Sequence, residues 1–162
     1  MAIVGTRKDE KGIRFEFLIS RIDESLNEGF YVEGMAITYA LFEERTYRLL
    51  DRLNVSYRKR DKLYDCLIKL EKAINDRTIN VITPRMSKDD FIDMLKDVLI
   101  TSNLIFDIQT WRNQRNDVIH DLAKTNIDYS SLKTTCENGR ELFGKYTAII
   151  MKIKKNIDVS TI

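Results

Sequence analysis

The most regular hydrophobic pattern in the chain lies in LKTTCENGRELFGKYTAIIMKIKKNI, residues 132–157. Its apolar residues recur mainly three, four or seven positions apart, which places them on one face of a helix. That face consists of Leu132, Cys136, Phe143, Tyr146, Ile149, Ile150, Ile153 and Ile157. A face this long predicts a helix that packs against several other helices.

The same periodicity recurs toward the N-terminus. It predicts helices over residues 15–26, ended by Gly29, and over residues 31–53, ended by Asn54. Ser56 is expected to cap a third helix with the buried face Leu63, Leu67, Leu70 and Ile74. Ser87, followed by Asp90 three positions later, is typical of a capping box and opens a helix that breaks near residues 102–103 or continues.

These segments together predict an all-α, up-down bundle of five or six helices. The 162 residues suit one domain, and neither strand alternation nor an internal repeat argues against it. Only 6 glycines and 1 proline are present, which favours long elements over many turns. Residues 1–11 are expected to form a flexible N-terminal arm, and residues 76–87, which include Pro84, the longest connecting loop.

Composition also narrows the class of protein. Cys66 and Cys136 lie in separate helical segments without C-x-x-C spacing, and no secretory segment opens the chain, so we expect reduced thiols in a cytoplasmic protein. No uncharged apolar run approaches the ~18–20 residues that a membrane span requires. One histidine and two scattered cysteines argue against a zinc site, which needs three or four converging ligands, and no cofactor is expected. The net charge of +2 leaves any attraction for nucleic acid to local basic patches.

The helix predicted over residues 104–122 contains a break in the hydrophobic pattern. Its expected buried stripe is Ile108, Trp111, Val118, Ile119 and Leu122, and helical spacing puts Arg115 in the middle of that stripe. A guanidinium is costly to bury without a partner. Arg115 must therefore meet a carboxylate, reach a cleft, or lie at an interface that receives an anion.

Further polar residues accompany Arg115. Asn116 and His120 are four positions apart and share a face, with Arg112 one turn earlier on the same line. Glu43 falls on the buried side of the helix predicted over residues 31–53. We expect it to pair with Arg115 or Arg112, because bundles often build polar sites from facing helices.

The run R-N-D-V-I-H, residues 115–120, resembles the arginine, polar residue, three residues, histidine signature of HEPN domains. The likeness extends to a small helical bundle with the motif on a late helix. It implies a metal-independent endoribonuclease of a toxin-antitoxin, abortive-infection or other antiphage system. It also implies a homodimer that joins two motifs across one cleft, with a protein antitoxin or a defence-complex partner possible.

The resemblance assigns roles to these side chains. His120 would act as base or acid toward RNA, Arg115 would bind the scissile phosphate, and Asn116 would orient one of them, giving a 2′,3′-cyclic phosphate and a 5′-hydroxyl. Leu122 stands where HEPN toxins controlled by AMP transfer often carry tyrosine, which argues against that control. Two alternatives stay open: a non-catalytic HEPN-like dimerisation or nucleotide-binding module, and an unrelated helical adaptor.

Overall fold

The structure, a computed structural model, describes residues 7–124, 126 and 129–157. That part of the chain is helical without strands, which confirms the predicted all-α bundle. A stretch of π-helix follows α4 and was not predicted. The elements are α1 (Arg7–Glu28), α2 (Tyr31–Arg52), α3 (Leu63–Asn75), α4 (Lys88–Leu95), the π-helix η1 (Lys96–Thr101), α5 (Leu104–Leu122) and α6 (Tyr129–Lys154).

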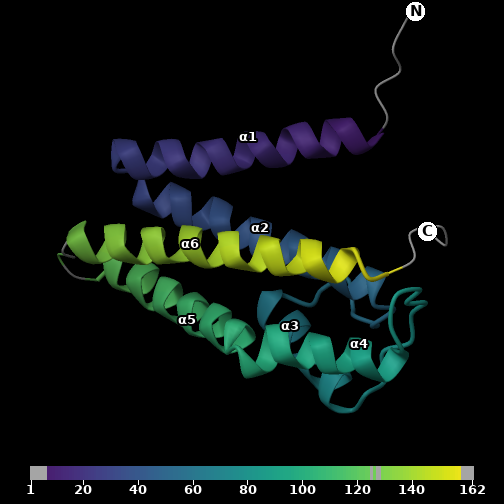
Figure 1. Ribbon diagram of the computed structural model, residues 1–162. Coiled ribbons are helices and arrows are strands. Elements are labelled where there is room, and N and C mark those ends of the chain that lie inside the picture. Colours follow the sequence, from purple (N-terminus) through teal and green to yellow (C-terminus); the bar gives the residue numbers. More distant parts are fainter. Residues whose placement is uncertain (1–6, 125, 127–128, 158–162) are drawn as a thin grey trace, which may run out of the picture.

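Helix α2 lies at the centre of the bundle. It packs against α1, α3, α5 and α6, while α6 also packs against α5 and α1 (Figure 1). Successive long helices run in opposite directions, with α1 and α2 forming one hairpin and α5 and α6 another. The shorter α3, α4 and η1 cover the bundle near the end where α2 and α6 finish.

Aromatic residues hold α2, α5 and α6 together. The ring centroid of Phe42 on α2 lies 5.4 Å from that of Trp111, 5.2 Å from that of Phe143 and 5.7 Å from that of Tyr146. The Tyr146 hydroxyl, fully buried, lies 2.7 Å from Thr46 Oγ1, so its polar atom is satisfied. Each such ring contributes roughly 1.5–3 kcal/mol by leaving water.

The helix ends follow from local chemistry. Gly29 ends the first hairpin's turn with a φ of +80°, a conformation that side chains disfavour. Asn54 and Asn103 have φ values of 55° and 64°, which asparagine tolerates better than most residues. Ser87 Oγ accepts a hydrogen bond from the backbone N–H of Asp90 at 3.1 Å, so the predicted cap is confirmed.

Two boundary predictions are wrong. Ser56 does not cap α3, which starts at Leu63, because residues 58–61 form a turn in which Arg58 N donates to Asp61 Oδ2 at 2.7 Å. The arm predicted for residues 1–11 is wrong from Arg7 onward, where α1 begins. Residues 1–6 lie outside the described residues. The connection predicted over residues 76–87 does separate α3 from α4.

None of the helices in the described residues combines the length and apolar character that crossing a bilayer requires. Cys66 and Cys136 are both buried and unpaired with each other, as their separate positions predicted. Burial raises the pKa of each thiol to about 11. They therefore behave as small apolar core residues.

Candidate functional site

Helix α5 positions four of the five residues that the sequence singled out. It starts after Asn103, where the backbone turns, and its first N–H, that of Leu104, donates to Ser102 Oγ at 3.3 Å. Ile108 and Trp111 fix its inner face in the core. The helix therefore carries its later turns, residues 112–120, along the outside of the α2–α6 pair.

Arg115 lies half-buried against α2. Its guanidinium carbon is 4.5 Å from the ring centroid of Tyr39, and its Nη1 donates to Asn116 Oδ1 at 3.0 Å. Its Nε is buried and has no hydrogen-bond partner in the described part of the chain. Burial lowers the Arg115 pKa, but a guanidinium keeps its charge in proteins. The site thus holds a cation that is only partly satisfied.

A second arginine repeats this arrangement one turn earlier. The guanidinium carbon of Arg112 lies 4.8 Å from the ring centroid of Tyr64 on α3. Its Nε donates to Gln109 Oε1 at 3.1 Å, and its Nη2 to Asn113 Oδ1 at 2.8 Å. The two arginines of the motif region are therefore stacked on tyrosines from two different helices.

Glu43 does not form the ion pair that was expected. Its Oε2 accepts the backbone N–H of Leu63, the first residue of α3, at 3.1 Å. No ion pair among the described residues joins it to Arg112 or Arg115, so that prediction is wrong. The reason is local, since the N-terminus of α3 presents unsatisfied N–H groups to α2 and favours a negative charge there.

Tyr39 is the residue that sequence reasoning missed. Its pKa is raised by burial first and by Glu43 second, and lowered by Arg115 and Arg112. The phenol is therefore close to Glu43, Arg112 and Arg115, the charged residues among which an ion pair was expected. The only signal in the sequence was its place on the apolar stripe of α2, where a tyrosine is ordinarily part of the core.

His120 and Asn116 are placed differently from one another. Asn116 is half-buried and holds Arg115, whereas the His120 side chain is exposed in the last turn of α5. No hydrogen bond or ion pair to the His120 side chain is found among the described residues. Five positions on a helix correspond to about 140° around its axis, so one chain presents Arg115 and His120 to different sides.

The rest of the predicted stripe is only partly buried. Val118 and Ile119 are half-buried, and Leu122 is 40% exposed, so its assignment to the core is wrong. Leu122 is the final residue of α5. The chain turns away at a helix end, so the last residue has fewer packing neighbours than a residue in the middle of the helix.

In the part of the chain that the structure describes, no three His, Cys, Asp or Glu side chains gather as a metal site needs. Comparison with known proteins adds no family, because no protein-family model, curated protein or solved structure matches this chain. The resemblance to HEPN domains therefore depends on Arg115, Asn116 and His120 together with the helical architecture.

Proposed function

We propose that this protein is a metal-independent endoribonuclease of a toxin-antitoxin or antiphage system, acting in the cytoplasm as a homodimer. The observation that carries the proposal is Arg115, a half-buried guanidinium held on Tyr39 of a neighbouring helix, with an Nε that has no partner among the described residues. A structural arginine at such depth normally has its donors satisfied. An arginine that awaits a phosphate does not.

The chemistry requires two proton transfers and a site for charge. In the cleavage, the RNA 2′-oxygen attacks phosphorus and the bond from phosphorus to the 5′-oxygen breaks, leaving a 2′,3′-cyclic phosphate and a 5′-hydroxyl. His120 takes the 2′-hydroxyl proton or gives one to the 5′-oxygen, because an imidazole nitrogen can accept or donate a proton. Arg115 stabilises the charge on the phosphorane, and Asn116 fixes the guanidinium through Nη1.

A second copy of the chain is part of the proposal, because one chain presents Arg115 and His120 to different sides. Exposed apolar side chains near the motif support an interface: Tyr64 is 47%, Ile68 41% and Phe106 68% exposed. Phe106 and His120 lie within about 40° of each other around α5. Apolar side chains exposed together favour association.

The test compares the wild type with Arg115→Ala and His120→Ala on single-stranded RNA in excess EDTA. We expect the rate constant to fall at least about 100-fold in each variant, the scale of losing a general acid-base or an oxyanion donor. The control is Gln114→Ala, an exposed position on the same helix, which should cleave like the wild type. Equal cleavage by all four proteins would refute the proposal.

The interface is tested separately. Phe106→Arg should convert a dimer into a monomer by light scattering and reduce cleavage while leaving helicity unchanged. Arg115→Ala should stay dimeric. A wild type that is monomeric at all concentrations yet cleaves RNA would disprove the shared site.

A non-catalytic module that binds a nucleotide or RNA is the second candidate function. It is favoured by the exposed His120, because no described side chain orients the imidazole and a catalytic base commonly has such a partner. In that case the wild type binds an anionic ligand without cleaving RNA, and Arg115→Ala lowers the affinity whereas His120→Ala does not.

A further inference from the structure

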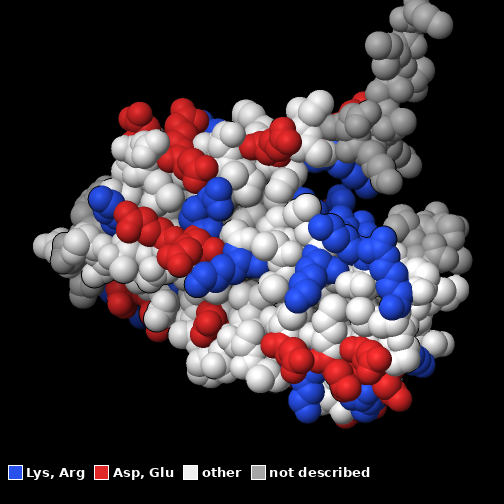
Figure 2. Space-filling view, in the orientation of Figure 1, with Lys and Arg blue, Asp and Glu red and all other residues white. Residues whose placement is uncertain are grey.

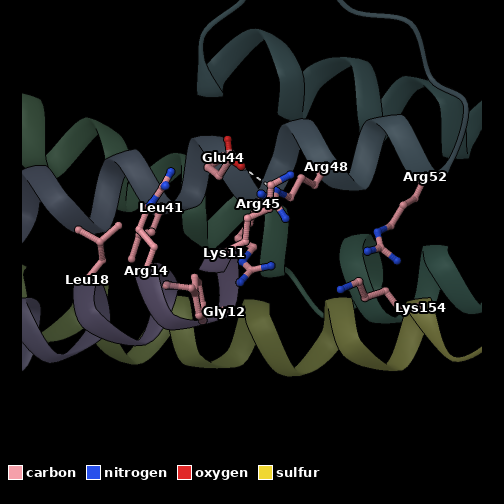
Figure 3. A pocket seen from close by; sticks show the side chains of 11 residues that line it. Lys11, Gly12, Arg14, Leu18, Leu41, Glu44, Arg45, Arg48, Arg52 and Lys154 are labelled. Atoms are coloured by element: carbon pink, nitrogen blue, oxygen red, sulfur yellow. Dashed lines mark hydrogen bonds and ion pairs between the residues drawn. The ribbon is translucent and has the colours of Figure 1, made fainter. Parts of the chain in front are cut away.

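A groove between α1, α2 and the end of α6 lies away from the α5 site. Its volume is about 650 Å³, and none of the described residues that line it belongs to α3, α4 or α5 (Figure 3). Its walls are formed by Lys11, Gly12, Arg14, Phe15, Leu18, Leu41, Glu44, Arg45, Arg48, Arg52 and Lys154. Six of these residues are basic and only Glu44 is acidic.

Among the described residues that line the groove, carboxylates are scarce. Glu44 pairs with Arg48 at 2.7 Å, which occupies the only carboxylate among the described lining residues. Arg45 lies with its guanidinium carbon 3.7 Å from the ring centroid of Phe15, and its buried Nε has no hydrogen-bond partner in the described chain. Burial, and then the charge of Arg48, lowers the pKa of both Arg45 and Arg52.

Such crowding of like charges costs free energy in the isolated protein. Figure 2 shows Lys and Arg side chains gathered over the C-terminal half of α6 and toward α1, while acidic side chains cover other parts of that face. The overall charge of the chain is only +2, so this concentration is local. A bound anion would offset the repulsion.

The spacing of the arginines suits a chain of anions. Arg45, Arg48 and Arg52 occur three and four positions apart on one side of α2, and at 1.5 Å per residue they span about 10 Å. The opposite walls supply Lys11 from α1 and Lys154 from α6, and Lys154 extends toward Arg52 (Figure 3). A cationic row of this length spans more than one phosphate, and guanidinium forks match phosphate oxygens in pairs.

The groove lacks a free surface for a base. Among the described residues that line it, Phe15 is the only aromatic one, and Arg45 already covers its ring. Stacking of bases on aromatic side chains is the usual way to hold them in single-strand sites. Contacts here would therefore go to the backbone, which carries no direct sequence information.

We propose that this groove binds consecutive phosphates of an RNA strand, without sequence preference, on the opposite side of α2 from the motif helix. The choice of RNA rests on the proposed ribonuclease function. The groove acts as a second contact that holds a long substrate while another part of the strand reaches the α5 site. A short RNA does not span both surfaces and gains nothing from the groove.

Binding is measured with the His120→Ala protein, so that cleavage does not interfere. A labelled 12-nucleotide single-stranded RNA is titrated, by anisotropy, against this protein and against versions that also carry Arg48→Gln and Arg52→Gln. The control pair is Lys133→Gln and Lys145→Gln on α6, which removes the same charge from lysines that pair with glutamates four positions away, as Arg48 does. Circular dichroism confirms that every version is folded.

We expect the groove pair to weaken binding at least about tenfold at 0.1 M salt, and the control pair by less than twofold. The slope of log K against log salt should become shallower by about 1.4 for the groove pair, since each phosphate contact to a single strand contributes about 0.7. Equal losses for the two pairs, or no loss for the groove pair, would overturn the proposal. Binding of inorganic triphosphate without any binding of the RNA would also overturn it.

A second measurement separates this proposal from the ribonuclease proposal. In the protein with His120 intact, the groove pair should slow cleavage of a long RNA at low concentration but leave cleavage of a dinucleotide unchanged. If the wild type cleaves nothing while the groove pair still loses RNA affinity, the ribonuclease proposal fails and the groove survives. If the wild type cleaves RNA and the groove pair binds like the control, only the groove proposal fails.

Discussion

Gly139 on α6 faces the ring of Trp111 on α5, and replacing it with alanine should destabilise the protein. A Cβ atom at residue 139 would lie 2.5 Å from Trp111 Cε2, 2.5 Å from Cζ2 and 2.6 Å from Nε1. Carbon atoms in contact are ordinarily about 3.5–4.0 Å apart. The ring, 2% exposed, must therefore move by about 1 Å, or α5 must move away from α6.

Both movements cost free energy. Trp111 Nε1 donates to the buried carbonyl of Thr135 at 2.8 Å, and the other side of the ring meets Phe42. Overpacking a core costs about 1–3 kcal/mol, and a buried donor left without its acceptor costs a similar amount. Alanine recovers about 1 kcal/mol over glycine within a helix. The net expectation is a loss of about 2–3 kcal/mol in the free energy of unfolding, or roughly 5–10 °C in Tm.

Urea unfolding, followed by circular dichroism and by the fluorescence of the single tryptophan, measures this change. Gly144→Ala on the same helix is the matched control, because a Cβ there meets only Arg140 Nη1 at an ordinary 3.6 Å. The control should gain up to about 1 kcal/mol from helix propensity. A Gly139→Ala protein that is as stable as the wild type, or that gains stability like the control, would refute a steric conflict with Trp111.

Three further outcomes follow from single contacts. Ser87→Ala should cost about 1 kcal/mol in urea unfolding, because it removes the cap on Asp90 N. The hydrogen bond from Lys69 holds the folded pKa of the Asp61 carboxyl below its ordinary value, so the contribution of Asp61 to stability is complete above the unfolded pKa and is lost as pH falls through the folded pKa. The difference in unfolding free energy between wild type and Asp61→Asn should therefore narrow from pH 7 to pH 3. A constant difference would contradict this expectation. Cys66 and Cys136, each with a pKa of about 11, should resist a thiol reagent at pH 8 until urea unfolds the chain, and fast labelling in buffer would show that the core opens.

Periodicity in the sequence predicted most of the fold because burial follows helical spacing. The face Leu63, Leu67, Leu70 and Ile74 is buried as expected, and Ser87 caps the helix that it precedes. Ser56 misled the prediction because a serine before an apolar run also fits a turn. The turn forms where Tyr57 stacks on Tyr47, with ring centroids 5.2 Å apart and an interplanar angle of 23°. Local helical spacing does not relate these two residues.

The candidate site was predictable only along its own helix. Arg115, Asn116 and Arg112 could be placed on α5 from spacing, and Arg115 is indeed half-buried. Its contact with Tyr39 joins positions 76 residues apart, and no pattern in one sequence predicts which helix α5 meets. Similarly, Arg45, Arg48 and Arg52 are visible as a row, but only the fold brings Lys154 to face them.

The position of α2 has a consequence for synthesis on the ribosome. Thr46 contacts Tyr146, 100 positions later in the chain, and Phe42 contacts Phe143 on the same distant helix. In a nascent chain the inner face of α2 therefore remains exposed to solvent until α6 leaves the exit tunnel. Contacts of such long sequence separation delay folding and leave apolar surface open to aggregation. During that interval the first hairpin is a natural client for chaperones that bind exposed aromatic residues.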